Sequence, residues 1–244
     1  MVYPTVEVRW FYKGALPFSV LRWFHKRTLA ARQGACQGEA RRGDRYLVLR
    51  ETDALGIKLR GEHDLSGSRF EVKQRSRQYG VIRFNAWAAG RVEEWHKWSF
   101  VLATQPLGES EADEVYGAGK ARSPWIAVDK RRELCIFRVA HGGNTAVGGQ
   151  VAGSLPDEAG DVGCDLELGR VRIGDQAWWT LCLEAFGHPD QLYDLLMHTA
   201  TVVFAPHVPD RVAPPGELGP SFTLGAEHSY AYPKWLSWQC QLSV

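Results

Sequence analysis

Apolar and polar side chains alternate along most of this chain with a period of two, the pattern of β-strands that bury one face. Near the N-terminus, Val6 and Val8 fall on one face while Glu7 and Arg9 fall on the other. The pattern predicts nine or ten strands, over residues 2–12, 45–50, 55–60, 70–75, 80–87, 95–103, 125–130, 134–139, 164–173 and 178–186. So many short strands favour an antiparallel sheet or barrel.

Two segments have helical spacing instead. The first is predicted over residues 16–26, with Pro17 in its first turn, and the second follows residues 187–190, with Asp190 as its cap. Loops are predicted at residues 29–43, 106–123 and 141–163. Residues 206–220 contain five prolines and two glycines, which predicts irregular structure. The aromatic residues that follow predict that an extension over 205–244 docks on a main domain over 1–204.

The composition is that of an ordinary globular protein: 244 residues, 45% hydrophobic and 23% charged. The formal net charge of +1 argues against a surface built to attract nucleic acid or anionic lipid. The N-terminus lacks a signal-peptide pattern, and the longest apolar run is too short to span a bilayer. The five cysteines are far apart and form no CxxC pair. We therefore expect a soluble cytoplasmic protein without membrane or nucleic-acid partners, whose oligomeric state is open.

The polar faces of the predicted strands are unusual because they carry charges at positions i and i+2. Lys58 and Arg60 share a face, as do Asp165 and Glu167. One interpretation is a solvated outer face, with cross-strand ion pairs. The other is a barrel whose apolar side is covered by helices and whose charged side lines the interior. Such an interior needs water, metal ions or an anionic ligand, because burying unpaired charges costs several kcal/mol per ion.

The basic and acidic positions suggest two different roles, phosphate binding and metal binding. Guanidinium and ammonium groups bind phosphate oxygens, and the candidates for this role are Arg9, Lys58, Arg60, Lys73, Arg83, Lys130, Arg132 and Arg138. Carboxylates supply the oxygen ligands that Mg²⁺ and Mn²⁺ prefer, and the candidates are Glu7, Asp165, Glu167 and Glu184. Together the two sets are suited to a complex of a metal with a polyphosphate.

Several of these pieces resemble, in order, the strands of the CYTH superfamily, the triphosphate tunnel metalloenzymes. Val-Glu-Val-Arg-Trp at residues 6–10 resembles the first strand, which typically reads Glu-x-Glu-x-Lys. The other matching pieces are residues 45–47, 55–60, 70–73, 128–132, 165–168 and 183–187. Together they span residues 2–204. Thr5 stands where the motif has its first Glu, and Arg9 where it has Lys.

The resemblance implies an α+β fold that is mainly antiparallel β, with an eight-stranded closed, tunnel-like barrel and helices packed on its outside. It also implies a triphosphate-containing small molecule as ligand and a divalent cofactor, Mg²⁺ or Mn²⁺. The leading hypothesis is a triphosphatase acting on inorganic tripolyphosphate or an organic triphosphate, with no side chain assigned as general base. The alternatives are a non-catalytic protein that binds polyphosphate or a nucleotide, and a barrel for an apolar ligand or a scaffold whose charges face solvent.

Overall fold

The computed structural model describes residues 2–29, 36–60, 69–101, 124–138, 162–205 and 220–241. The predicted loop at residues 106–123 and most of the loop at 141–163 lie outside these ranges. The strands are β1 (Val2–Lys13), β2 (Cys36–Leu47), β3 (Leu55–Arg60), β4 (Arg69–Arg83), β5 (Ala89–Val101), β6 (Trp125–Arg138), β7 (Gly163–Ile173) and β8 (Gln176–Phe186). The helices are α1 (Phe18–Leu29), α3 (Leu192–Val203) and α4 (Tyr232–Gln241), with short 3₁₀ turns η1 (Pro189–Gln191) and η2 (Ala226–His228).

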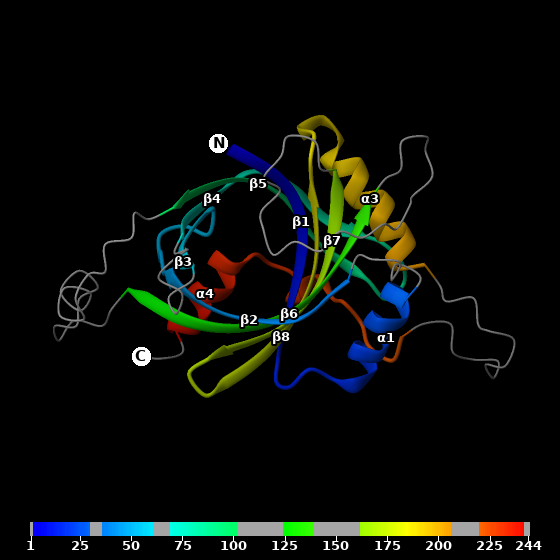
Figure 1. The fold of residues 1–244 in the computed structure, drawn as a ribbon, viewed down its shortest axis with the longest axis horizontal. Coiled ribbons are helices and arrows are strands. Elements are labelled where there is room, and N and C mark those ends of the chain that lie inside the picture. The colour runs from blue at the N-terminus through cyan, green and yellow to red at the C-terminus, as the bar shows by residue number, and fades with distance from the viewer. Residues whose placement is uncertain are drawn as a thin grey trace, which may run out of the picture.

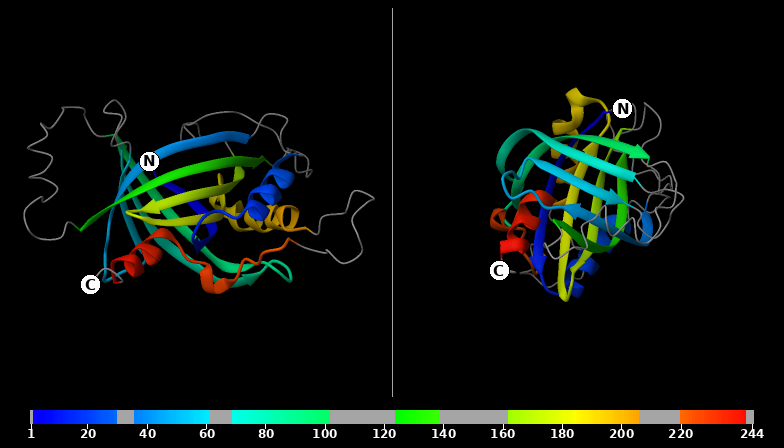
Figure 2. Two further views of the ribbon diagram at one scale, coloured as in Figure 1. Left: turned by 90° about the horizontal axis from the view of Figure 1, so that it is seen from below. Right: turned by 90° about the vertical axis from the view of Figure 1, so that its left-hand side faces the viewer.

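The eight strands form one closed antiparallel barrel in the order β1-β5-β4-β3-β2-β6-β7-β8 (Figures 1 and 2). This confirms the predicted fold class. Two pairs of predicted strands are in fact single long strands, β4 and β6. The predicted hairpin is present, with Tyr46 of β2 opposite Lys58 of β3.

The loop predicted at residues 29–43 is wrong in its second half, because β2 already begins at Cys36. The residues at this end of β2 are polar on both faces, so no apolar alternation marks the strand. Arg41 is exposed on the outside, whereas Asp44 is buried in the barrel, 1% exposed. Both faces are polar because one meets solvent and the other meets the charged interior.

The outer face of the barrel carries the larger hydrophobic core. Val8 and Trp10 of β1 and Leu183 of β8 are fully buried there, as expected from the alternation of the strands. Helices α1 and α3 cover this face, and Figure 1 shows both on the outside of the strands. Because the apolar face points outward under the helices, the polar face of each strand points into the barrel. No helix within the described ranges is long and apolar enough to cross a membrane.

A second apolar cluster lies inside the barrel at one end. Phe11 of β1, Val128 of β6 and Val171 of β7 pack there against Trp235 and Leu236 of α4. The Trp235 ring stacks on Phe11, with 4.6 Å between the centroids. This end of the interior is therefore filled by side chains of the C-terminal helix.

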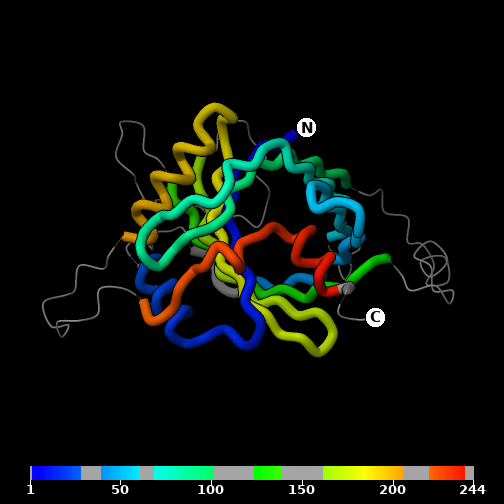
Figure 3. The backbone as a smooth tube through the Cα atoms, turned by 180° about the vertical axis from the view of Figure 1, so that it is seen from behind, coloured from blue at the N-terminus to red at the C-terminus, as the bar shows by residue number. Residues whose placement is uncertain are grey.

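The described part of the C-terminal segment, residues 220–241, runs along the barrel before it reaches that end (Figure 3). Leu224 exchanges backbone hydrogen bonds with the β4–β5 connection, donating to Trp87 and accepting from Ala89. Further along, the amide of Tyr230 donates to the carbonyl of Arg9. The described part of the segment thus packs on the barrel with hydrogen bonds and aromatic contacts.

Candidate functional site: a charged pocket inside the barrel

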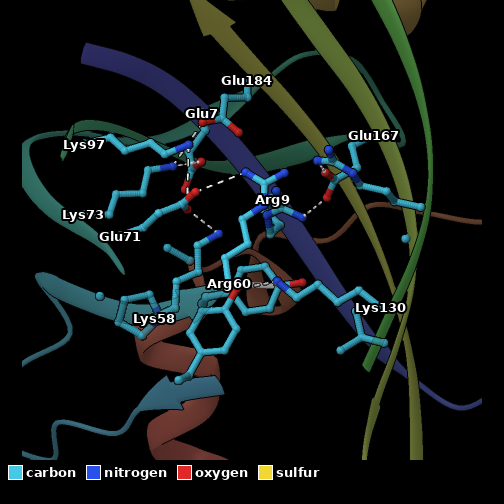
Figure 4. A pocket seen from close by; sticks show the side chains of 18 of the residues that line it. Glu7, Arg9, Lys58, Arg60, Glu71, Lys73, Lys97, Lys130, Glu167 and Glu184 are labelled. Atoms are coloured by element: carbon cyan, nitrogen blue, oxygen red, sulfur yellow. Dashed lines mark hydrogen bonds and ion pairs between the residues drawn. The ribbon is translucent and has the colours of Figure 1, made fainter. Parts of the chain in front are cut away.

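Beyond the apolar cluster, the barrel encloses a cavity of about 140 Å³ (Figure 4). Its lining includes nine Lys and Arg residues and four Glu residues. Positive charge predominates even without Arg131, whose side chain is exposed and alternates with those of Lys130 and Arg132. The basic residues of the lining are Arg9, Arg42, Lys58, Arg60, Lys73, Lys97, Lys130, Arg131 and Arg132, and the acidic ones are Glu7, Glu71, Glu167 and Glu184. A surplus of basic groups around a small cavity favours a multiply charged anion as its ligand.

Four carboxylates form a row across neighbouring strands. Glu7 of β1 is the register partner of Glu93 of β5 on one side and of Glu184 of β8 on the other. Asp165 of β7 is in turn the partner of Glu184. Directly opposed residues of an antiparallel pair share a face, so all four carboxylates face the interior. Arg75 neutralises the end of the row, because its Nη1 lies 2.9 Å from Glu93 Oε1.

Lys73 of β4 connects the two central carboxylates of this row. Its Nζ lies 2.5 Å from Glu7 Oε2 and 3.2 Å from Glu184 Oε1. Burial disfavours the charged ammonium of Lys73, but the attraction of Glu184 and Glu7 outweighs this effect. The pKa of Lys73 is therefore raised well above its ordinary value. Burial likewise acts against ionisation of Glu184, yet Lys73 and Lys97 lower its pKa to about 2. Three full charges therefore meet at this point.

Asp165 forms no direct ion pair among the described residues, and Arg132 and Arg138 only partly offset the effects that raise its pKa. Burial, followed by the charges of Glu184 and Glu167, raises the pKa of Asp165 to about 8. Its Oδ1 is buried and makes no hydrogen bond within the described residues, and the same holds for Oγ1 of Thr5. Buried polar atoms normally have a partner, so these two oxygens indicate room for water or a ligand beside the carboxylate row.

The basic groups of the pocket are held by shared carboxylates. Arg9 Nη1 lies 2.7 Å from Glu167 Oε1, and Arg132 Nη1 lies 3.2 Å from the other oxygen of Glu167. Against the effect of burial, the two guanidinium groups lower the pKa of Glu167 well below its usual range. Nε of Arg9 is buried without a hydrogen-bond partner among the described residues. A second donor of Arg9 thus remains for an anion.

A second shared carboxylate, Glu71, holds three further cations. Its oxygens lie 2.7 Å from Lys58 Nζ, 3.1 Å from Arg60 Nη1 and 3.8 Å from Lys97 Nζ. These cations overcome burial and lower the pKa of Glu71 far below normal. Lys97 is less well compensated, because Lys58 and Lys73 are also close. Burial and these like charges lower the pKa of Lys97 to about 8 despite the attraction of Glu71.

Lys130 lies where the charged pocket meets the apolar cluster. Its Nζ donates to the hydroxyl of Tyr46, lies 3.4 Å from Asp44 Oδ2 and sits 3.7 Å from the centre of the Tyr232 ring. Burial lowers the pKa of Lys130 well below its usual value, against the attraction of Asp44. The ring faces also favour the charged ammonium, so the first turn of α4 forms part of the pocket wall.

Most of the site residues predicted from sequence meet in this pocket. Its lining includes the predicted metal ligands Glu7, Glu167 and Glu184 and the predicted phosphate ligands Arg9, Lys58, Arg60, Lys73, Lys130 and Arg132. Asp165 belongs to the carboxylate row without lining the cavity. Arg83 and Arg138 end their strands and do not line it, and Arg83 is exposed. β4 has register irregularities at 75/77 and 78/80, so counting by twos from Lys73 does not locate Arg83.

Several residues of the pocket had no role predicted from the sequence, among them Arg42, Glu71, Lys97 and Tyr232. Arg42 fell in the predicted loop, and Tyr232 reaches the pocket through contacts that no local pattern encodes. Glu71 and Lys97 had a signal, because each lies two residues from another residue of the lining, Lys73 and Trp95 respectively. Extending the charge alternation along β4 and β5 would have found them.

The carboxylate row also fits a divalent cation. Ligand atoms of Glu7, Glu184 and Cys182 all lie within 4.8 Å of one another. Carboxylate oxygens are the preferred ligands of Mg²⁺ and Mn²⁺, and Asp165 contributes a further oxygen without a partner nearby. The chemistry of these donors is therefore compatible with a divalent metal next to an anion.

The protein is a closed eight-stranded antiparallel barrel. Its interior holds shared carboxylates and an excess of basic groups, which together form a pocket suited to an anion. This strand number and closure are those implied by the sequence resemblance to the triphosphate tunnel metalloenzymes. No protein-family model and no curated protein matches the sequence.

Similar solved structures include a conserved hypothetical protein from Pyrococcus furiosus, at 14% identity and a TM-score of 0.46, covering 94% of this chain and 98% of that one. A Hippeastrum protein described as a candidate adenylyl cyclase with a dominant triphosphatase activity gives 10% identity and a TM-score of 0.43, covering 84% and 89%. The triphosphatase of the mimivirus capping enzyme gives 10% identity and a TM-score of 0.41, covering 82% and 89%.

Proposed function

We propose that this protein is a metal-dependent phosphohydrolase that acts on inorganic tripolyphosphate or an organic triphosphate. The observation that carries the proposal is the placement of a carboxylate row and a surplus of basic groups around one small cavity. Such a cavity offers separate ligands to a divalent cation and to the oxygens of a polyphosphate. The similar triphosphatases agree with the proposal but do not carry it.

The basic residues would bind and orient the phosphates. Arg9, Arg60 and Arg132 offer planar guanidinium groups, while Lys58 and Lys130 act as point charges. Each of them shares a carboxylate with a neighbour, so it is held in place before a ligand arrives. This preorganisation reduces the ordering cost of binding and favours the extended charge of a phosphoryl group in transfer.

The metal, Mg²⁺ or Mn²⁺, would be held by the row that includes Glu7, Glu184 and Asp165. Glu167 is the alternate ligand, since both of its oxygens already accept from arginines. When bound, such a cation polarises the phosphoryl group and lowers the pKa of coordinated water. The ammonium of Lys73 lies between Glu7 and Glu184, so it must turn away from at least one of them when a metal binds. Its long stem lets it contact a phosphate instead.

A non-catalytic function is the second candidate. Thr5 stands where the tunnel motif has a carboxylate, and Lys73 already compensates the two central glutamates. A pocket with its own internal cation binds polyphosphate or a nucleotide without requiring a metal. We place either activity in the cytoplasm, the compartment in which thiols such as those of Cys164 and Cys182, free in the structure, remain reduced.

The test is release of phosphate from tripolyphosphate and from nucleoside triphosphates with Mg²⁺ or Mn²⁺, followed by a malachite-green assay. Glu184→Gln should abolish release, because it removes a central carboxylate of the row. Glu133→Gln is the matched control, since Glu133 lies outside the pocket and pairs with His25 of α1 at 2.7 Å. Binding without turnover would establish the non-catalytic function, and neither binding nor turnover would eliminate both.

A further inference from the structure

The carboxylate row has a thiol beside it. Cys182 lies on β8 two residues before Glu184, so both side chains project from the same face of the strand. Its register partners are Arg9 of β1 and Glu167 of β7, which also face the interior. Cys182 is fully buried, yet it belongs to neither apolar cluster, unlike Cys164. The thiol is therefore in the charged part of the barrel.

This thiol is close enough to the carboxylates to share a metal ion with them. The ligand atoms of Cys182, Glu7 and Glu184 lie within 4.8 Å of one another. A metal with bonds of about 2.0 Å to oxygen and about 2.3 Å to sulfur holds tetrahedral ligands roughly 3–4 Å apart. Rotations of the two glutamate side chains are enough to close that difference.

An independent observation points to a ligand at the two glutamates of this group. Oγ1 of Thr5, a residue only 6% exposed, has no hydrogen-bond partner within the described part of the chain. Thr5 lies two residues before Glu7 and so shares its face, next to the carboxylate row. Within the row itself, Oδ1 of Asp165, the register partner of Glu184, is also buried and makes no hydrogen bond in the described ranges. Metal-bound water would supply the missing partner of each of these two oxygens, one beside Glu7 and one beside Glu184.

We propose that Cys182, Glu7 and Glu184 hold a borderline divalent ion such as Zn²⁺ more tightly than Mg²⁺. The proposal rests on the proposed function only in taking the carboxylate row as the metal site. Mg²⁺ gains little from sulfur, whereas a thiolate is a strong ligand for Zn²⁺ and Cd²⁺. On binding, the S–H bond breaks, the S–metal bond forms, and the proton passes to solvent or buffer. Zn²⁺ then competes with Mg²⁺ for the same two glutamates.

The experiment uses the full reduced chain, freed of metal and titrated with Cd²⁺ as a spectroscopic probe for Zn²⁺. We expect the ultraviolet charge-transfer band of a cadmium–thiolate bond, and Cys182→Ser should remove it and weaken Cd²⁺ binding by about tenfold or more. Cys164→Ser is the matched control, because Cys164 is equally buried but lies in the outer core. This variant should keep the band. In thermal melts, Zn²⁺ should raise Tm more than Mg²⁺ at equal concentration.

A band of unchanged intensity in Cys182→Ser, or a Zn²⁺ shift no larger than that of Mg²⁺, would overturn the proposal. If Cys182→Ser does not fold, Glu184→Gln decides the matter, since it should weaken the band while leaving every cysteine in place. The result is separable from the proposed function. A cadmium band without triphosphate turnover keeps the thiol ligand and refutes the hydrolase, whereas Mg²⁺-supported turnover without the band refutes only the thiol ligand.

Discussion

The ammonium of Lys130 lies 3.7 Å from the centre of the Tyr232 ring, so a residue of the barrel wall is covered by a residue of the C-terminal helix. The same ring stacks on Tyr46, with 5.3 Å between the centroids, and lies 5.1 Å from the guanidinium of Arg9. A single side chain of α4 thus connects the apolar end of the barrel interior to its charged pocket.

Replacing this ring should therefore affect both stability and binding. We expect Tyr232→Ala to weaken tripolyphosphate binding and to lower the free energy of unfolding by about 2 kcal/mol. This is less than the cost of deleting a fully buried aromatic ring, because Tyr232 is half-buried. Tyr232→Phe should retain both, because the ring face and not the hydroxyl contacts Lys130. Urea unfolding and calorimetric titration measure the two effects. A phenylalanine variant as defective as the alanine variant would show that the hydroxyl matters instead.

Lys73 should stabilise the metal-free protein. Lys73→Met removes the counter-ion that Glu7 and Glu184 share and leaves only the more distant Lys97 and Arg9 to offset their charges. Breaking such an ion pair from one side costs about 3 kcal/mol where the pair is buried. We expect urea unfolding to show that loss in chelator. Because the metal would then replace the lost charge, added Mg²⁺ should stabilise the variant more than the wild type. An equal Mg²⁺ effect on both proteins would place the metal away from these two glutamates.

Ionisation of Asp165 should lower the free energy of unfolding as the pH rises. Its folded-state pKa of about 8 is far above the ordinary value of 3.8, so folding keeps a proton that the unfolded chain releases. Stability therefore falls as pH rises from about 4 to 8. Asp165→Asn cannot ionise, and at pH 8 we expect it to be more stable than the wild type by a few kcal/mol, at ~1.4 kcal/mol per pKa unit. At pH 4 the two should melt together, which differential scanning calorimetry tests.

Lys97 should make anion binding dependent on pH. Its pKa of about 8 is lowered from the ordinary value of 10.5, so the free protein loses this positive charge as the pH passes 8. A bound polyphosphate favours the protonated form, so affinity should fall above pH 8 by up to tenfold per pH unit, with proton uptake on binding. Calorimetry in buffers of different ionisation enthalpy measures the uptake. Lys97→Arg keeps its charge and should show a shallower fall over pH 7–9, because of the two groups only Asp165 then still titrates near pH 8.

The alternation of the sequence was sufficient to predict antiparallel strands with one apolar and one charged face, and the resemblance to the tunnel enzymes implied their closure into an eight-stranded barrel. Part of β2 was not predicted as a strand because neither of its faces is apolar. Arg41 faces solvent and Asp44 faces the charged interior. Lys58 and Lys73 were found because regular alternation holds through their strands. Arg83 was misassigned because the irregularities of β4 interrupt that alternation. Tyr232 depends on contacts with residues far away in sequence, and no local pattern reports them.

Because α4 fills one end of the barrel interior, the barrel is not a passage through which a molecule can be threaded. On the proposed function, a long phosphate polymer would enter the pocket only by its terminus, and the remainder of the polymer would stay outside. Shortening would then proceed from chain ends, and each product would have to leave before the next end could enter. A linear polymer and its cyclic counterpart, which has no end, should therefore be distinguished by the shape of the protein alone.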